Sequence, residues 1–392
     1  MGGRVDTVQP ESFLDGPGRM PLLFEPIKLR ELTLPNRIII APMCEFSAVD
    51  GCATDWHIIH LGHLALSGAG LLIIEATGVE PQGRISRECL GLYSDENEAA
   101  LERVLAIVRK YSTMPIGIQL GHAGRKASIR KPADGRGPAP ENEGGWPVVA
   151  PSAIAFSNGW KQPIKLDNAG MASVIESFRM ATVRSDRLGI DLIELHSAHG
   201  YLMSSFLSPL ANQRDDAYGG SLENRMRFPL EITRAVRKAW PKHKPLGVRF
   251  NGTDWLEGGI TPDEAVAYAQ ALAEAGCDYV DVSSGGNGYA EIPLTPGYQV
   301  PFAERVKKEV GIATMAVGLI REPRHAEQIL QDGQADMIAL GRGMLNDPRW
   351  PWHAAEDLGA TVASPHQYMR AVTREGVPVH DTIVKPGMPR PI

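Results

Sequence analysis

The chain has 392 residues, of which 43% are hydrophobic and 22% are charged, and this composition excludes collagen-like, coiled-coil and disordered proteins. Its 46 acidic residues outnumber its 40 basic residues and give a formal net charge of -6. A general nucleic-acid or membrane-surface binder needs a basic surface, so the charge disfavours both of these classes.

Residues 1–20 mix glycine, proline and charged side chains without the apolar segment of a secretory signal, and we interpret them as a mobile leader. No later run approaches the ~18 apolar residues that span a bilayer, so we expect no membrane partner. The cysteines show no CxxC pair and no regular spacing, which predicts neither a disulfide framework nor an iron–sulfur cluster. Reduced thiols fit a cytoplasmic protein best; they are Cys44, Cys52, Cys89 and Cys277.

Short apolar segments rich in β-branched residues alternate with longer stretches of helical period along residues 21–372. Most of these segments are apolar throughout, which is typical of parallel strands that helices cover. The predicted strands, in chain order, are Arg37 to Met43, Leu71 to Ala76, Pro115 to Leu120, Leu192 to His196, Leu246 to Phe250, Tyr279 to Ser283, Ala313 to Val317 and Met337 to Leu340.

Amphipathic stretches between the strands predict helices. One of them starts at Thr261, a capping residue that precedes a proline and two acids, which suit the first turn of a helix. The clearest predicted helices are Glu96 to Tyr111, Asn168 to Leu188, Glu223 to Trp240, Pro262 to Ala275 and Pro323 to Gln331.

Eight strand–helix pairs predict an α/β chain folded as a single (β/α)8 TIM barrel over residues 21–372. A doubly wound sheet is the alternative, but its usual GxGxxG turn is absent after the first strand. The long loop from Ser128 to Trp146, after strand 3, is rich in Gly, Pro and charge and is interpreted as an excursion over the barrel mouth. Residues 373–392 form a proline-containing tail that we expect to be irregular.

Chemistry in such barrels gathers at the C-terminal ends of the strands. The side chains there are polar, basic or small, and they define the candidate site. In chain order they are Pro42, Met43, Cys44, Phe46, Ala76, Gln119, His196, His199, Tyr201, Arg249, Ser284, Gly285, Gly318, Gly341 and Arg342.

Two glycines follow strands 7 and 8, and a guanidinium lies beside the second one. Gly318, Gly341 and Arg342 would suit a phosphate held by backbone N–H groups and one arginine, in the place where barrels commonly bind phosphate. The alternative is that each glycine only supplies a backbone angle at a turn.

Arg249 ends a buried strand, where an unpaired guanidinium would cost several kcal/mol, so it must face a carboxylate or an anionic ligand. Gln119 lies at the matching end of strand 3. A planar ligand with donor and acceptor edges, such as a flavin pyrimidine ring, would satisfy both groups. A structural ion pair at Arg249 is the alternative.

His196 and His199 follow strand 4, and two imidazole N–H donors that converge on one oxygen would polarise a carbonyl group. Tyr201 is a possible proton donor. A metal site with Glu194 and a pair of packing histidines remain as alternatives. Cys44 is either a weak donor to a cofactor or a small buried hydrophobic residue.

Several motifs together resemble the Old Yellow Enzyme family of FMN-dependent ene-reductases, in its bacterial thermophilic-like, xenobiotic-reductase-like branch. The resemblance runs from about Leu23 to Arg370. The motifs are Asn36-Arg37 with Ala41 to Cys44, Gly117 to Lys126 (GIQLGHAGRK), His196 to Leu202 (HSAHGYL), Asp216 to Phe228 (DAYGGSLENRMRF), Asp281 to Gly285 (DVSSG), Pro296 to Phe302 (PGYQVPF), Ala316 to Ile320 (AVGLI) and Gly341-Arg342 before Asp347-Pro348.

This resemblance implies an enzyme that binds FMN. It implies that NADPH or NADH reduces the flavin, which then passes hydride from N5 to the β-carbon of an electron-poor alkene in a ping-pong reaction. The implied ring contacts are Cys44, Ala76, Gln119 and Arg249, with Pro42, Met43, Ser284 and Gly285 as further cofactor contacts and Gly318, Gly341 and Arg342 near the phosphate.

The resemblance also assigns the substrate side. His196 and His199 would hold the carbonyl or nitro oxygen, and Tyr201 would give the proton. Phe46 stands where the branch usually has tyrosine, which would change the substrate region. Arg370, in the segment PHQYMR, resembles the arginine that enters a neighbouring subunit's site, and implies a homodimer or homotetramer.

Two other classes of function stay open at this point. A metal-dependent barrel hydrolase would use Glu194, His196 and His199, and a flavin-binding protein would have no turnover. Metal analysis distinguishes the first, and bleaching of the flavin by NADPH distinguishes the second.

Overall fold

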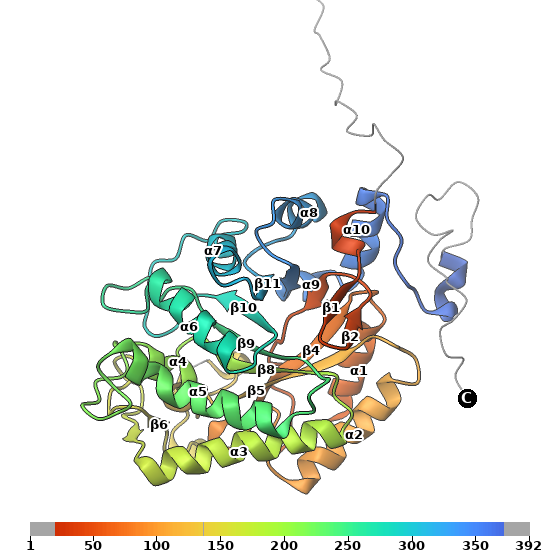
Figure 1. Cartoon of the computed structure of the whole chain (residues 1–392). Helices are drawn as coiled ribbons and strands as arrows, with labels where there is room; N and C mark the ends of the chain where they lie inside the picture. The colour runs from red at the N-terminus through yellow and green to blue at the C-terminus, as the bar shows by residue number, and fades with distance from the viewer. Residues whose placement is uncertain (1–19, 136, 372–392) are drawn as a thin grey trace, which may run out of the picture.

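Eight parallel strands close into a barrel in the order β10-β11-β12-β3-β4-β5-β8-β9 (Figure 1). All eight predicted strands are present, so the α/β class and the (β/α)8 barrel are confirmed. The strands are β3 (Ile38–Ile40), β4 (Leu71–Gly78), β5 (Ile116–Gly121), β8 (Leu192–Ser197), β9 (Leu246–Asn251), β10 (Tyr279–Ser283), β11 (Ala313–Ala316) and β12 (Met337–Leu340).

The structure is a computed structural model that describes residues 20–135 and 137–371. The predicted leader, apart from Met20, and the predicted tail at 373–392 lie outside the described residues. The division of the chain into leader, barrel and tail therefore stays a prediction.

Helices follow the strands and cover the outside of the barrel (Figure 1). The cap predicted at Thr261 is present, since its hydroxyl accepts from the backbone N–H of Glu264. The five predicted helices are confirmed, with small shifts at their ends, as α2 (Asp95–Val108), α3 (Asn168–Arg187), α5 (Leu222–Ala239), α6 (Pro262–Glu274) and α8 (Pro323–Gln331).

The structure adds helices that the sequence pattern did not predict. Two of them, α7 and α10, carry a proline in the first turn, where its missing N–H costs nothing. The added helices are α1 (Asp55–Ala65), α4 (Leu202–Leu207), α7 (Val300–Val310), α9 (Arg342–Asn346) and α10 (Trp350–Leu358).

The barrel interior is layered, because alternate residues of each strand point inward. Its lower layers form one apolar cluster that includes Ile39 and Tyr279. A Cβ added at Gly247 would stand 2.1 Å from the Tyr279 ring, so only glycine leaves room for that ring. A hairpin of β1 (Ile27–Leu29) and β2 (Leu32–Leu34), which the sequence did not predict, joins this cluster and closes the N-terminal end.

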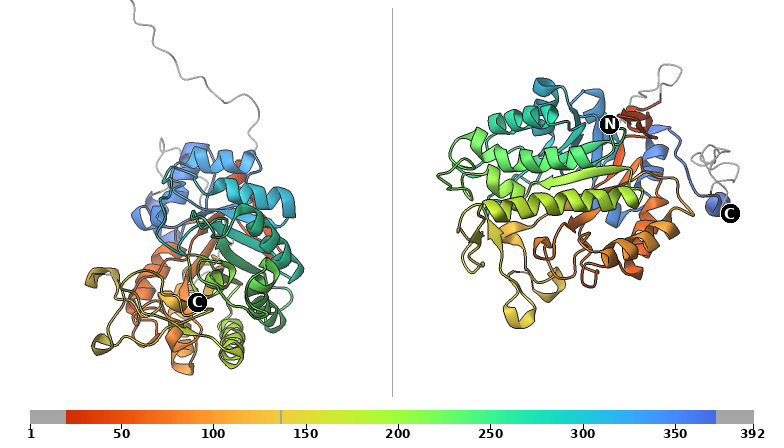
Figure 2. Two further views of the ribbon diagram at one scale, coloured as in Figure 1. Left: turned by 90° about the vertical axis from the view of Figure 1, so that its left-hand side faces the viewer. Right: turned by 60° about the horizontal axis from the view of Figure 1, so that its bottom comes forward.

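A long excursion joins β5 to α3, and it contains the predicted loop from Ser128 to Trp146. It carries two short paired strands, β6 (Val149–Ala150) and β7 (Ile164–Lys165), and Figure 2 shows it in yellow, standing out from the barrel. Trp146 packs against an apolar cluster that Tyr201 also contacts. The excursion therefore borders the C-terminal mouth of the barrel, as predicted.

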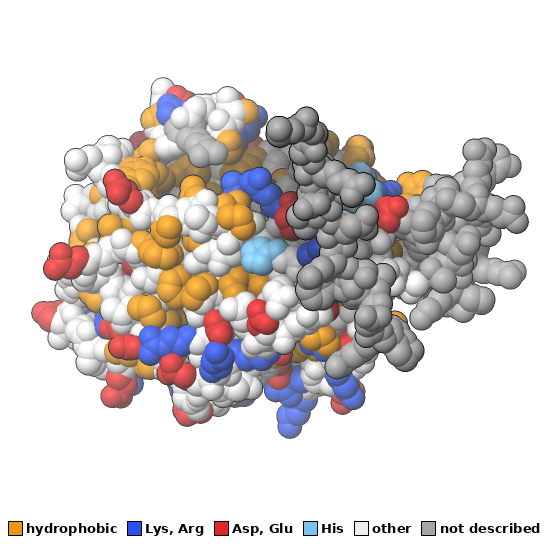
Figure 3. Space-filling view, turned by 90° about the horizontal axis from the view of Figure 1, so that it is seen from above, with side chains coloured by type: hydrophobic (Ala, Val, Ile, Leu, Met, Phe, Trp, Pro, Cys, Tyr) orange, Lys and Arg blue, Asp and Glu red, His pale blue; other side chains and the backbone are white. Residues whose placement is uncertain are grey.

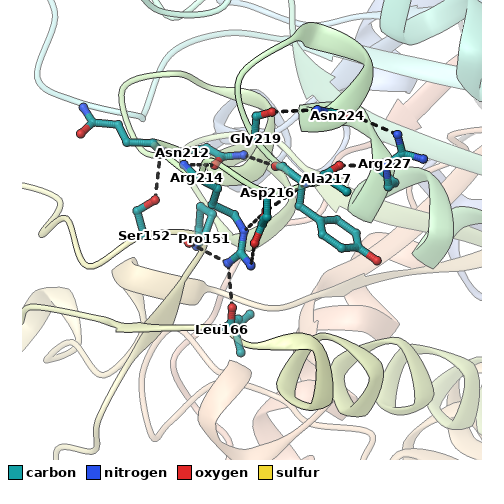
Figure 4. Close-up of polar contacts among 12 residues, drawn as sticks. Pro151, Ser152, Leu166, Asn212, Arg214, Asp216, Ala217, Gly219, Asn224 and Arg227 are labelled. Carbon is teal, nitrogen blue, oxygen red and sulfur yellow. Dashed lines mark hydrogen bonds and ion pairs between the residues drawn. The ribbon is translucent and has the colours of Figure 1, made fainter.

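Arg214 and Asp216 form a clamp that ties the excursion to the segment between α4 and α5 (Figure 4). Arg214 Nη1 donates to the carbonyl oxygens of Pro151 at 2.9 Å and Leu166 at 2.7 Å. Its Nε and Nη2 donate to the two carboxylate oxygens of Asp216 at 2.9 and 2.5 Å. The first residue of the motif Asp216 to Phe228 therefore stabilises the fold.

The face seen from above in Figure 3 carries hydrophobic side chains across its middle, and many charged side chains toward one edge. Exposed apolar side chains are ordinary on folded proteins, so this face by itself identifies no interface. Among the described residues, no helix has both the length and the apolar character needed to cross a bilayer.

Candidate active site

Polar side chains replace apolar ones in the upper layer of the barrel interior. Gln119, Glu194, Arg249 and Asp281 continue the inward alternation of their strands. Register brings them together, because Gln119 pairs with Glu194 and Arg249 pairs with Asp281. All four are buried, so each needs a polar partner.

These four groups form one charged cluster in which several atoms lack partners. Gln119 Nε2 donates to Glu194 Oε1 at 2.8 Å, and Arg249 Nε lies 3.0 Å from Asp281 Oδ2. The second contact is an ion pair without hydrogen-bond geometry. Within the described part of the chain, Arg249 Nε, Asp281 Oδ1 and Glu194 Oε2 are therefore buried without a hydrogen bond. Such atoms are costly, and a cluster of them is typical of a ligand site.

The cluster also has perturbed protonation. Burial raises the pKa of Glu194 to about 8, and the Asp281 carboxylate adds to this shift while Arg249 opposes it. Burial raises the pKa of Asp281 as well, although Arg249 lies beside it. One of the two carboxyl groups therefore keeps a proton near pH 7, so the Arg249 guanidinium faces one carboxylate instead of two.

Two histidines and a tyrosine stand beside this cluster, with His196 near the end of β8 and His199 and Tyr201 just after it. The ring centroids of His196 and His199 are 5.1 Å apart, and the Tyr201 ring lies 4.8 Å from that of His196. The backbone N–H of Ala198 donates to His196 Nδ1, so the neutral ring carries its proton on Nε2. His199 Nε2 shares a 2.7 Å hydrogen bond with Ser283 Oγ. The structure thus brings the three predicted groups together.

Burial keeps these three groups uncharged. It lowers the pKa values of His196 and His199 well below the usual value, and the nearby Arg249 and Lys126 charges add to the shift. Burial also raises the pKa of Tyr201. A neutral imidazole N–H can donate to a carbonyl or nitro oxygen, and a neutral phenol holds a proton that it can transfer.

Lys126 is a site residue that the sequence reasoning missed. Its Nζ donates to the carbonyl oxygens of His199 at 2.6 Å and Gly286 at 3.0 Å, and it lies 5.3 Å from the Tyr201 ring centroid. Burial lowers the pKa of Lys126 to about 8. It ends the motif Gly117 to Lys126, which could have indicated a role in the site. A lysine after a strand, however, resembles an ordinary surface residue.

The predicted residues beside the ring form a mostly apolar wall. Cys44, Phe46, Ala76 and Tyr201 pack against the same apolar cluster, which includes Cys89. Phe46 has a φ of 50°, which a bulky residue rarely adopts. A hydrogen bond with Cys89, followed by burial, raises the pKa of the Cys44 thiol well above its usual value, so the thiol stays protonated.

The predicted phosphate residues lie where the neighbouring strands β11 and β12 end. Gly318 has a φ of 129°, which favours glycine. Gly341 directly precedes α9, and a Cβ added there would have Met43 Sδ at 3.6 Å as its nearest neighbour. Arg342 is exposed at the start of α9. The glycines and the arginine therefore share one edge of the mouth.

The remaining predicted cofactor residues lie in loops at the same end of the barrel. Pro42 follows β3, and Gly285 follows β10 with a φ of 74°. Ser284 Oγ donates to Gln299 Oε1 at 2.6 Å, and Ser283 Oγ lies 3.3 Å from the same oxygen. Gln299 thus links this loop to the hydroxyl that holds His199, a role that the sequence alone did not reveal.

Arg370 lies in the final 3-10 helix, η6 (His366–Ala371), and its side chain is outside the described part of the structure. Its reach into a neighbouring site stays a prediction. A cavity of about 270 Å³, lined in part by Asn36, Gly68, Met114 and Pro365, lies at the N-terminal ends of the strands. It contains none of the other predicted site residues, so its size does not make it the active site.

The alternative metal site at Glu194, His196 and His199 does not assemble. Glu194 bonds to Gln119, and His199 bonds to Ser283. Within the described residues, the side chains that converge as metal ligands form a different group. The geometry therefore gives the hydrolase alternative no support.

The residues of the mouth fit FMN chemically. Arg249 offers a buried Nε–H without a hydrogen-bond partner, and Gln119 offers amide groups to a planar ring with donor and acceptor edges. The two glycines beside Arg342 suit a phosphate. When bound, FMN supplies hydride transfer, and the protein supplies binding, orientation and charge.

The model of the NADH:flavin oxidoreductase / NADH oxidase family matches residues 22–360. The chain therefore belongs to this family, and the expected membership of the Old Yellow Enzyme family is confirmed. By class, the protein is an NAD(P)H-dependent flavin oxidoreductase with FMN as its cofactor.

Individual relatives are similar over nearly their whole length. The NADPH dehydrogenase of Geobacillus sp. (strain WCH70) is 44% identical over 351 residues, which cover 89% of this chain and 98% of the relative. The NADPH dehydrogenase of Listeria innocua is 42% identical over 354 residues, or 90% and 99% of the two chains. The structure of morphinone reductase matches with a TM-score of 0.72 at 28% identity, covering 93% of this chain and 96% of its own.

Proposed function

We propose that this enzyme reduces the C=C bond of electron-poor alkenes, namely α,β-unsaturated carbonyl or nitro compounds. The observation that carries the proposal is the group of His196, His199 and Tyr201, which are neutral and lie together beside the charged cluster. FMN held by Gln119 and Arg249 would supply the hydride transfer from NAD(P)H to the β-carbon.

The histidines would bind and polarise the substrate. His196 Nε2–H and His199 Nδ1–H would donate to the carbonyl or nitro oxygen, where negative charge develops as hydride arrives, with the Ser283 hydroxyl donating to His199 Nε2. Because the site is buried, each donor would be worth about 10²- to 10³-fold in rate. The hydrogen bond from Ser283 and the contact of Lys126 with the His199 carbonyl would hold this geometry.

Tyr201 would donate the proton to the α-carbon. Its raised pKa keeps the phenol protonated, and its ring lies against His196 on the same side of the mouth. The proton moves from Tyr201 Oη to carbon, and the phenol recovers a proton from solvent afterwards. Trp146 of the excursion packs against the same apolar cluster as Tyr201 and would limit water in the site.

The cofactor contacts of the proposal are those at the mouth. Gln119 and Arg249 would face the flavin ring, with Pro42, Met43, Cys44, Ala76, Ser284 and Gly285 around it. Gly318, Gly341 and Arg342 would hold the phosphate. Phe46 would pack beside the substrate.

Steady-state kinetics test this proposal. When NADPH and 2-cyclohexenone are both varied, we expect parallel double-reciprocal lines and cyclohexanone as the product, because both molecules use one site in turn. Intersecting lines, or NADPH oxidation without cyclohexanone, would contradict the proposal. NADH in place of NADPH, in the same assay, decides the preferred nucleotide.

The assembly is part of the proposal. A cytoplasmic homodimer or homotetramer, in which Arg370 reaches the neighbouring substrate site, follows from the family resemblance. Light scattering of the purified enzyme measures the oligomer. Arg370→Ala should raise the KM for the enone if the arginine enters that site, and an unchanged KM would remove it from the proposal.

A further inference from the structure

Two thiols and a carboxylate converge beside the mouth, at β4 and the loops that follow β3 and β4. Cys44 comes from the loop after β3, Glu75 from β4, and Cys89 from the loop after β4. One ligand atom from each residue lies within 4.8 Å of the other two. Glu75 is 4% exposed and Cys89 is fully buried. The proposed reaction uses neither Glu75 nor Cys89.

The spacing fits a tetrahedral metal ion. With Zn–S bonds of about 2.3 Å and Zn–O bonds of about 2.0 to 2.2 Å, tetrahedral ligand atoms lie roughly 3.5 to 3.8 Å apart. Three atoms within 4.8 Å of one another can reach that separation by small side-chain rotations. Thiolates select soft or borderline ions such as zinc over magnesium and calcium, which prefer oxygen.

The carboxylate of this group is already oriented by its surroundings. The backbone N–H of Glu45 donates to Glu75 Oε2 at 3.2 Å. His57 Nδ1 accepts from the backbone N–H of Thr54 at 2.9 Å, so its Nε2 carries the proton and faces Glu75 Oε1 at 3.4 Å. That Nε2 is buried without a hydrogen bond of good geometry. Partners of this kind commonly position the carboxylate and histidine ligands of metal sites.

We infer that Cys44, Glu75 and Cys89 form a binding site for a thiophilic divalent cation, with zinc as the ion to test, in the wall of the active site. Binding breaks two S–H bonds and forms two metal–thiolate bonds; the two protons go to buffer, and no redox change occurs. A water molecule can take the fourth position. Any inhibition of turnover rests on the proposed function, because Cys44 also faces the cofactor region, but binding of the ion does not.

Zinc binding to the FMN-loaded enzyme tests this inference. The enzyme is reduced with a phosphine, freed of metal by a chelator, dialysed against buffered zinc and analysed for metal, protein and FMN. We expect one zinc per chain. Cys89→Ala should weaken zinc binding by about 100-fold, because one of four ligands is lost. The matched control is Cys277→Ala, which also removes a buried thiol and should keep wild-type zinc affinity.

A second measurement does not depend on any variant. X-ray absorption at the zinc edge of the loaded wild-type enzyme should show two sulfur neighbours at about 2.3 Å and lighter neighbours at about 2.0 to 2.1 Å. Absence of bound zinc, a shell without sulfur, or equal zinc binding by Cys89→Ala and wild type would each overturn the inference. Because these readouts need no alkene, they separate this inference from the proposed reaction.

Discussion

Arg214 and Arg249 are both buried arginines paired with an aspartate, yet they differ in how many of their N–H donors have a hydrogen-bond partner. Arg214 donates to both oxygens of Asp216 and to two backbone carbonyls, so each of its three nitrogens has at least one hydrogen-bond partner. Arg249 lies against Asp281 without hydrogen-bond geometry, and its Nε has no hydrogen bond. A buried arginine whose donors have protein partners stabilises the fold. A buried arginine with an unpaired donor indicates a place where a ligand binds.

The difference follows from where each arginine lies. Arg214 bridges the excursion and the segment before α5, where backbone carbonyls of two loops are close by. Arg249 points into the barrel from β9, where neighbouring strands have already used their backbone groups on one another. Only side chains or a ligand can complete its hydrogen bonding.

The largest expected effect is a loss of enone reduction when the histidines beside Arg249 are removed. In the double variant His196→Ala and His199→Ala, we expect enone reduction to fall by at least about 10³-fold, because both oxygen-binding donors are lost. FMN should stay bound, since Gln119, Arg249 and the glycines remain. Turnover of 2-cyclohexenone and the flavin-to-protein ratio measure this; wild-type turnover would remove the histidines from the mechanism.

The next largest effect is a loss of stability when the clamp at Arg214 is removed. Arg214→Leu should lower the free energy of unfolding by about 3 kcal/mol, because buried carbonyl oxygens of Pro151 and Leu166 lose their donor. Urea denaturation measures the change. Arg227→Leu, at a partly exposed arginine in the same region, is the control and should cost much less. Equal losses in the two variants would show that the clamp has no special role.

Tyr201→Phe should separate the two halves of the reaction. We expect reoxidation of the reduced enzyme by 2-cyclohexenone to slow by about 100-fold, because the proton donor is lost. Reduction by NADPH should change little, since it needs no proton from the phenol. Anaerobic stopped-flow absorbance follows both steps, and equal slowing of both would contradict the role of Tyr201.

The burial of Lys126 makes the free energy of unfolding depend on pH. Its pKa of about 8 in the folded chain lies below the usual value of 10.5, so the unfolded chain binds more protons between these two pH values. Stability from this group therefore rises with pH, by about 2 kcal/mol from pH 8 to 10. The difference in unfolding free energy between wild type and Lys126→Met should show this rise; a flat difference would mean that Lys126 titrates normally.

Phe46→Tyr should have the smallest effect on stability and a moderate one on kinetics. Phe46 packs against the same apolar cluster as Cys44 and Tyr201, so an added hydroxyl would make this wall more polar. We expect the ratio of kcat/KM values for an enone and a nitroalkene to change, with little change in Tm. Identical ratios for the variant and the wild type would make position 46 irrelevant to substrate choice.

Much of the fold was predictable because the strands are buried on both faces and appear as continuous apolar runs. The residues after those strands were predictable for the same reason, since parallel strands end at one face. The hairpin Ile27 to Leu34 was not, because each of its strands has only three residues.

The contacts within the site depended on three-dimensional register. The sequence required a partner for Arg249, but only the pairing of β9 with β10 identifies it as Asp281. Lys126 reaches His199 across many intervening residues, and Cys89 meets Cys44 only because two loops fold over one wall. No local spacing carries such information, whereas the grouping of His196, His199 and Tyr201 was visible in one short motif.

The most direct test of the central claim is an anaerobic absorption titration of the purified enzyme, first with NADPH and then with 2-cyclohexenone. If the buried polar cluster around Arg249 binds FMN and the histidines bind an enone beside it, the flavin absorption should bleach with NADPH and return with the enone. Bleaching without return would contradict enone reduction. A colourless protein that FMN cannot reconstitute would contradict the flavin site itself.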